Sequence, residues 1–171
     1  MPDFRPAESQ LERQTDRLHS LIGDEIAGAW AVWNLEHDEW FADLPVVLQM
    51  KRGAQLEVCW EKLDDLSIAW HTIDLTVPPT AWVEWPLEWR RNALPELQAI
   101  PGAVVMELAA SRFRFVTEAV DHPASHREVW LTAGLWIRTI DAGLHVFNAL
   151  DENGVSSRPP LRDADNDWRP L

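Results

Sequence analysis

Acidic side chains gather in one segment of this 171-residue chain, between Asp24 and Asp43. The segment holds six Asp or Glu residues and contains no Lys or Arg. Three of them, Glu36, Asp38 and Glu39, surround an expected hairpin turn, so their carboxylates should project into solvent. Such a group of charges attracts a basic surface through Coulomb forces. The pattern predicts a partner-binding surface, and an ordinary solvated turn is the alternative interpretation.

A second acidic turn is expected near the end of the chain. Asp151 and Glu152 precede Asn153-Gly154, a combination that is typical of turns. We predict that these carboxylates also face a partner, although residues that simply favour turns account for the same pattern. The candidate partner-binding residues are therefore Glu36, Asp38, Glu39, Asp43, Asp151 and Glu152.

Acid–base catalysis would need titratable side chains that face each other in a cleft, with one pKa shifted by burial. The hairpin acids are too exposed for this chemistry. Asp43, His71 and Asp74 lie on neighbouring predicted strands and are better candidates for a hydrolase. Because the sequence does not fix the register of the strands, it leaves open whether the three side chains share a face.

Metal binding and nucleophilic catalysis find little support in the residue spacing. His122 and His126 have the H-x3-H spacing of metal ligands on a helix, but Pro123 disfavours a helix there. No serine lies in a G-x-S-x-G motif, and Cys59 stands in the middle of a predicted strand. The glycines are isolated and form no phosphate-binding loop. We therefore expect no catalytic residue, no metal site and no cofactor.

The chain is also rich in tryptophan, with eleven Trp, five Phe and no Tyr. Trp82, Trp85 and Trp89 have the spacing that lines one side of a helical turn. They could close an apolar pocket for a small ligand, or anchor a Pro-rich segment to the sheet. Trp30 and Trp33 point to opposite faces of one predicted strand, so either a second layer covers the outer face or one indole is exposed.

The whole chain carries 15 basic and 28 acidic residues, a net charge of −13. This balance argues against nucleic-acid binding and against docking on anionic lipids, because both depend on Lys and Arg. The single cysteine cannot form an internal disulfide, and the sequence shows neither a membrane span nor a signal peptide. We therefore expect a cytoplasmic protein.

The hydrophobic pattern predicts the elements that position these candidates. Apolar residues at helical spacing predict an amphipathic helix over residues 8–26. A Pro- and Trp-rich insertion at residues 76–102 interrupts the strands and is expected to contain short helical turns within 86–99. Alternating residues predict strands at residues 29–35, 40–50, 55–61, 66–75, 103–108, 113–117, 128–140 and 144–150.

These elements predict an α+β fold, in which an antiparallel sheet of about seven or eight strands carries the N-terminal helix. In this interpretation residues 1–155 form a single domain. Residues 156–171 contain three prolines and alternating Arg and Asp, and are expected to form a flexible or loosely packed tail. Exposed sheet edges also make a homodimer plausible.

The combined pattern favours a non-catalytic acidic protein that recognises a basic protein partner. The size, the acidity and the outline of a sheet with a helix are similar to those of bacterial immunity and antitoxin proteins. This resemblance is one of physical type and assigns no role to any residue. The alternatives are a small-ligand-binding domain with a Trp-lined pocket, and a hydrolase that uses Asp43, His71 and Asp74.

Overall fold

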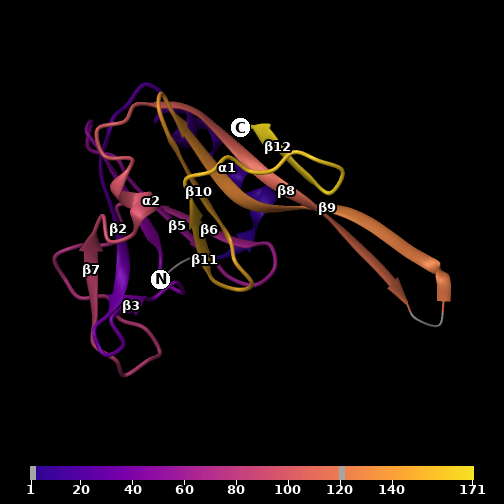
Figure 1. Cartoon of the computed structure of the whole chain (residues 1–171), viewed down its shortest axis with the longest axis horizontal. Coiled ribbons are helices and arrows are strands. Elements are labelled where there is room, and N and C mark those ends of the chain that lie inside the picture. Colours follow the sequence, from indigo (N-terminus) through magenta and orange to yellow (C-terminus); the bar gives the residue numbers. More distant parts are fainter. Residues whose placement is uncertain (1–2, 120–121) are drawn as a thin grey trace.

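A computed structural model describes residues 3–119 and 122–171, which form two antiparallel β-sheets and an N-terminal helix (Figure 1). The elements are β1 (Arg5–Pro6), α1 (Ala7–His19), β2 (Ile26–Asn34), β3 (Glu39–Trp40), β4 (Val46–Met50), β5 (Gln55–Trp60), β6 (Asp65–Trp70), β7 (Leu87–Arg91), α2 (Pro95–Gln98), β8 (Val105–Ala119), β9 (His122–Thr139), β10 (Gly143–Asn148), β11 (Asn153–Ser156) and β12 (Asn166–Pro170). In the described part of the chain, neither helix is long and apolar enough to cross a membrane.

The strands are divided between two sheets. The first sheet has the order β1-β6-β5-β4-β2-β3, with β7 paired to β2 as a seventh strand, and the second has the order β11-β10-β9-β8-β12. The predicted antiparallel strands and N-terminal helix are confirmed, but the prediction of one sheet of seven or eight strands is wrong. All six residues of β5 are buried, so this strand needs a layer on each face, and a single sheet with one helix cannot supply both.

The main hydrophobic core lies between the two sheets. Leu56 and Val58 of β5 pack in the same buried cluster as Leu135 and Ile137 of β9. The indole of Trp60 is also buried in this cluster, and its Nε1 donates a hydrogen bond to the backbone oxygen of Val146 in β10, 3.2 Å away. The inward face of each sheet is thus covered by the other sheet, and the outward face of the first sheet is left for other segments to cover.

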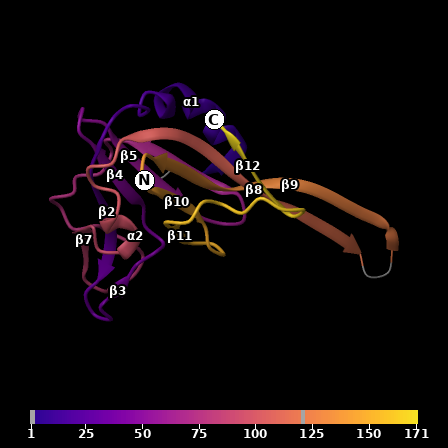
Figure 2. The ribbon, with the colours of Figure 1, turned by 45° about the horizontal axis from the view of Figure 1, so that its top comes forward.

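Helix α1 lies beside this core and is bonded to both sheets (Figure 2). The hydroxyl of Thr132 in β9 donates to the carboxylate of Glu8 at 2.9 Å, and Trp70 Nε1 in β6 donates to Gln14 Oε1 at 3.0 Å. The helix is shorter than the predicted range of 8–26. It ends at His19, and Gly23, with a φ of 79°, then turns the chain into β2.

Three other predicted boundaries also differ from the structure. The strand expected over 40–50 is divided into β3 and β4, with Pro45 between them. The strand expected over 66–75 ends at Trp70, because His71 has a positive φ of 57°. Within residues 86–99, where helical turns were expected, Leu87–Arg91 pairs with β2 as strand β7 and only Pro95–Gln98 is helical.

The last strands extend further than the hydrophobic pattern indicates. Strands β8 and β9 form a long hairpin that projects from the two sheets (Figures 1 and 2). Within the segment 156–171, Asn166–Pro170 forms β12 and pairs with β8, from Phe113 to Ala109. The C-terminal end of the chain is therefore bound to the second sheet.

Candidate functional site

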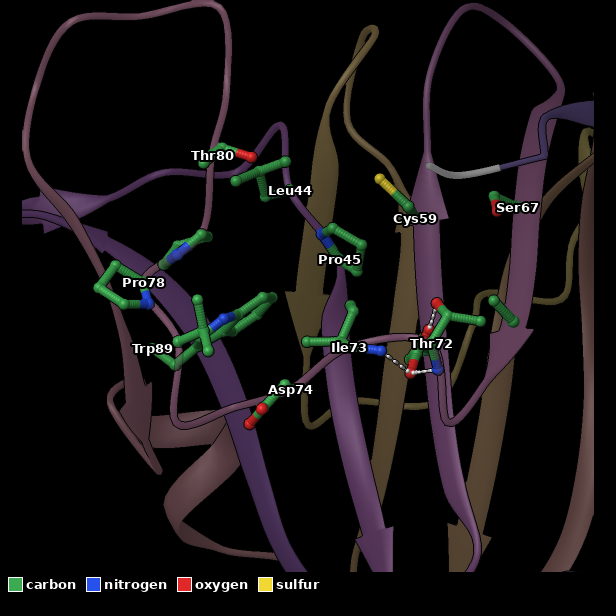
Figure 3. A pocket seen from close by; sticks show the side chains of 14 residues that line it. Leu44, Pro45, Cys59, Ser67, Thr72, Ile73, Asp74, Pro78, Thr80 and Trp89 are labelled. Carbon is green, nitrogen blue, oxygen red and sulfur yellow. Dashed lines mark hydrogen bonds between the residues drawn. The ribbon is translucent and has the colours of Figure 1, made fainter.

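A pocket of about 400 Å³ lies on the outer face of the first sheet, the face directed away from the second sheet (Figure 3). Glu57 and Cys59 of β5 and Ala69 of β6 form part of its floor, because they alternate with residues that point into the core. The segment 72–80 crosses in front of them, and Trp89 of β7 lines one side. The pocket is therefore formed between the sheet and the Pro-rich insertion.

The carboxylate of Glu57 holds the chain at Thr72 and Ile73, just ahead of this insertion. Its side chain is 2% exposed and makes no salt bridge within the described part of the chain. Its Oε1 accepts hydrogen bonds from Gln55 Nε2 at 2.8 Å and from the backbone amides of Thr72 at 2.7 Å and Ile73 at 3.0 Å. Its Oε2 accepts a further bond from the Thr72 hydroxyl. The buried charge is thus compensated by dipoles of the segment that covers it.

The other polar groups of the pocket floor are also engaged. Ser67 Oγ accepts a hydrogen bond from the backbone amide of Asp3 at 3.1 Å. Cys59 is 1% exposed, and its Sγ donates to the backbone oxygen of Asp43. Burial raises the pKa of the Cys59 thiol to about 12, so the thiolate needed for nucleophilic attack is not formed at neutral pH. The pocket offers shape and apolar surface rather than a reactive group.

The three hydrolase candidates are not joined by hydrogen bonds within the described residues. Burial raises the pKa of Asp43, which precedes Leu44 at the rim of the pocket. His71 Nε2 accepts a bond from the backbone amide of Gln55 at 3.2 Å. Asp74 lines the pocket, but its carboxylate accepts bonds from the amide and hydroxyl of Thr76, which lower its pKa. His71 and Asp74 thus have local partners of their own, and no hydrogen bond among the described residues joins the three side chains into an acid–base pair.

The hairpin acids lie at the connection between β2 and β3. Among Glu36, Asp38 and Glu39, only Asp38 has side-chain hydrogen-bond partners in the described part of the chain. Asp38 accepts hydrogen bonds from Trp33 Nε1 at 2.8 Å and from Arg90 at 3.2 Å, which lower its pKa. Glu36 and Glu39 are exposed, and neither makes an ion pair within the described residues. Two of the three hairpin carboxylates are therefore left to meet an external cation.

The acids at the start of the same segment are used inside the molecule. Asp24 is buried and accepts hydrogen bonds from the backbone amides of Glu25 and Arg52. The carboxylate of Glu25 pairs with Lys51 at 2.8 Å. The six acids between Asp24 and Asp43 therefore do not form one continuous patch.

The remaining predicted acids, Asp43, Asp151 and Glu152, lie in a second region. Asn153 Nδ2 donates to the backbone oxygens of Ala42 and Leu44, on either side of Asp43, at 2.6 and 3.0 Å. The turn that carries Asp151 and Glu152 is thereby placed next to Asp43. Asp151 Oδ1 also accepts a weak bond from the Leu63 amide at 3.3 Å.

Two of the predicted tryptophans lie beside the hairpin acids and not in the pocket. Trp82 and Trp85 pack against Phe41, with ring centroids 5.6 and 6.4 Å apart, and Trp85 makes an edge contact with His37 at 5.1 Å. The side chain of Trp82 is 72% exposed. The expected helical turn is absent here, and of the three tryptophans only Trp89 lines the pocket. We call the exposed set the tryptophan–acid surface; it consists of Leu35, Glu36, Glu39, Trp82, Glu84 and Trp85.

A second pocket, of about 450 Å³, lies on the outer face of the second sheet and contains a serine–histidine pair. Ser111 Oγ and His145 Nε2 are 2.8 Å apart, and a Cβ on Gly134 would clash with both. The His145 ring is stacked on Phe147, and burial lowers its pKa to about 4. Such a weak base is poorly suited to activate a serine at neutral pH, and among the described residues no carboxylate orients the ring.

Two of these features escaped sequence reasoning. Sequence alternation places Glu57 on the strand face opposite Leu56 and Val58 but does not show that this face is covered; the one available signal was the apolar and Pro-rich run that later covers it. The pairing of Ser111 with His145 joins strands whose register no local pattern determines. Within the described residues, no group of three or more His, Cys, Asp or Glu side chains could hold a metal ion.

Comparison of the chain with protein-family models, with curated proteins and with solved structures finds no significant match.

Replacing Glu57 tests its role in holding the pocket. Glu57→Leu should lower the free energy of unfolding by about 2 kcal/mol, because the amides of Thr72 and Ile73 lose their acceptor. Glu57→Gln should cost much less, since the amide oxygen can replace Oε1 while the amide nitrogen donates to the Thr72 hydroxyl. Urea denaturation measures the stability, and hydrogen exchange at residues 72 and 73 measures the release of the segment. Equal stability of the Leu variant and the wild type would contradict this role.

The half-buried His145 predicts a dependence of stability on pH. Its pKa in the folded chain, about 4, is below the usual value of about 6.5. The unfolded chain therefore binds more protons between these values, and stability should fall by up to about 3 kcal/mol as the pH drops from 6.5 to 4. In His145→Gln this part of the pH dependence should disappear, as measured by urea denaturation at several pH values. His126→Gln, which replaces an exposed histidine, should retain it.

Proposed function

We propose that the chain is a non-catalytic binding protein that recognises a basic protein through the tryptophan–acid surface. The observation that carries the proposal is the exposure of Trp82 and Trp85 on the support of Phe41. Tryptophan is enriched among the residues that contribute most to binding, because it buries a large area with few rotatable bonds. Two indoles fixed on one buried ring present such an area before a partner arrives.

Charge complementarity supports a basic partner. Glu36 precedes His37, whose ring contacts Trp85, and Glu39 belongs to the same hairpin. Glu84 lies between Trp82 and Trp85 in sequence, and all three carboxylates are exposed. Within the described residues none of the three has an ion pair that a partner would need to break. The net charge of −13 would also accelerate the encounter with a positively charged protein at low ionic strength.

The second acidic region extends the same argument. Asp43 is four residues along the chain from Glu39, and the turn carrying Asp151 and Glu152 is bonded next to it. A basic partner that reaches past the hairpin would meet these carboxylates at the rim of the contact. An immunity protein or antitoxin that neutralises a basic nuclease-type toxin is one class of protein that works in this way.

A small-ligand-binding role is the second candidate, and the pocket on the first sheet favours it. Its volume of about 400 Å³ is within the range of small-molecule sites. Because Glu57, Ser67 and Asp74 already have hydrogen-bond partners, a suitable ligand is uncharged and largely apolar. A hydrolase receives less support, since His71 and Asp74 have separate partners and no hydrogen bond among the described residues joins either of them to Asp43.

The proposed partner contact is tested by paired variants. A basic protein captured from the source cells on the immobilised chain would be purified, and its Kd measured by calorimetry. Trp82→Ala combined with Trp85→Ala should weaken binding by about 100-fold or more. Glu36→Gln combined with Glu39→Gln should weaken it by about tenfold, mainly through the association rate, and should reduce the dependence on salt.

Matched controls lie elsewhere on the surface. Leu161→Ala removes a side chain that is 69% exposed, and Glu12→Gln removes an exposed charge on α1; neither should change the Kd. A purified partner that binds every variant equally, or one without a basic surface, would refute the proposed contact.

The ligand-binding candidate predicts a different result. An uncharged aromatic compound that enters the pocket should raise the melting temperature of the wild type, through the linkage between binding and stability. Ala69→Phe fills the pocket floor and should abolish this shift, whereas the Trp82→Ala and Trp85→Ala variant should retain it. Absence of any shift across a panel of such compounds would leave the pocket without a ligand-binding role.

A further inference from the structure

The hairpin of β8 and β9 continues beyond the last strands that flank it (Figures 1 and 2). Strand β12 pairs with β8 only as far as Phe113, and β10 pairs with β9 only as far as Gly134. From Arg114 and Trp130 outward, the hairpin has only two strands. We call residues 114–117 and 127–130 the arm.

The arm carries apolar side chains on both faces. Phe115 and Val129 are opposite each other on one face, and Val116 and Trp130 lie on the other. Val116, Val129 and Trp130 are all exposed, with Val129 at 48%. An isolated two-stranded ribbon is only marginally stable in water, and exposed apolar residues on a sheet edge favour pairing with another strand. The arm therefore has the properties of a contact surface.

The two edges of the arm are not equivalent. On the β8 edge, the backbone amide of Arg114 donates to the oxygen of Asp165 at 2.8 Å, and the Arg114 side chain pairs with the Asp165 carboxylate. The loop before β12 thus protects the base of this edge, as far as Arg114, and leaves a shorter free edge here than on β9. On the β9 edge, residues 126–132 have no neighbouring strand among the described residues. A strand that joins the arm would therefore add to β9.

The charge of the arm indicates which kind of partner would pair with it. Residues 112–132 contain three arginines and three acidic residues, so this stretch is neutral within a chain of net charge −13. A strongly basic or acidic partner would gain little here. Two copies of this chain repel each other elsewhere, and the arm is a place where they can meet without that cost. The arm also projects from the end of the molecule opposite β3 and β7 (Figures 1 and 2).

We propose that the arm is a dimerisation element, in which the free edge of β9 pairs antiparallel with the β9 edge of a second copy. The contact is isologous, as a two-fold axis requires, and it forms a four-stranded sheet with the order β8-β9-β9-β8. Each copy satisfies the exposed backbone groups of the other. The tryptophan–acid surface of each copy stays accessible, at the two far ends of the dimer.

Sedimentation equilibrium of the full chain over a concentration series tests the proposal. The wild type should show a reversible monomer–dimer equilibrium. Val129→Lys places a charge beside the same charge of the second copy and should raise the Kd of the dimer by about tenfold or more. Ile140→Lys, at a side chain that is 64% exposed beyond the other end of β9, should leave the Kd unchanged. Circular dichroism checks that each variant is folded.

Hydrogen exchange then identifies the edge. Alternate amides within residues 126–132 should become protected as the concentration rises in the wild type, but not in Val129→Lys. A chain that stays monomeric at all concentrations, or a dimer unaffected by Val129→Lys, would overturn the proposal. Raising the salt concentration should maintain or strengthen this dimer, whereas it should weaken binding of a basic protein to the tryptophan–acid surface, so the two proposals can fail separately.

Discussion

Burial of the Glu57 carboxylate is the constraint on which the outer half of the first sheet depends. A carboxylate in this position would destabilise the fold unless donors reach it, and the chain supplies them from β5 itself and from residues 72 and 73. Those bonds fix where the Pro-rich insertion leaves the sheet. From there the insertion encloses the pocket, carries Trp82 and Trp85 to Phe41, and returns as β7 along β2.

The fold determines which of the many acidic side chains remain exposed and unpaired. Arginine and lysine neutralise some carboxylates locally, as in the pairs of Glu25 with Lys51 and of Asp38 with Arg90. The carboxylates of Glu36 and Glu39 have no ion pair among the described residues, and they belong to the hairpin whose His37 contacts the exposed Trp85. Exposed ion pairs contribute little to stability, so these pairings mainly determine which charges are available at the surface. The position of the cations, and not only the number of acids, thus defines the candidate surface.

The sequence predicts the local elements of this fold better than their assembly. The alternation in β5 was correctly identified, but it does not reveal that Glu57 and Cys59 face a second covering layer. The opposite orientations of Trp30 and Trp33 indicated that such a layer, or an exposed indole, was needed. In the structure both indoles are half-buried, beneath the guanidinium groups of Arg91 and Arg90.

Long-range pairing accounts for most of what sequence reasoning missed. Asn153 bonds to the backbone of Ala42 and Leu44, and Ser111 bonds to His145. Both contacts join segments that are distant in sequence and whose register is set by the whole sheet. The division into two sheets has the same origin, since a strand pattern shows which side chains are buried but not which strand lies beside it. The spacing of the tryptophans alone was enough to propose Trp89 as a pocket residue. It could not show that Trp82 and Trp85 lie outside that pocket.

The position of Cys59 has a practical consequence. The chain has a single thiol, which lies at the floor of the pocket, is 1% exposed and is held almost entirely in its protonated form. A thiol reagent can reach it only when the insertion separates from the first sheet or when the chain opens more widely. The rate at which Cys59 is alkylated therefore measures the rate of that opening. The measurement requires neither an added label nor a second cysteine.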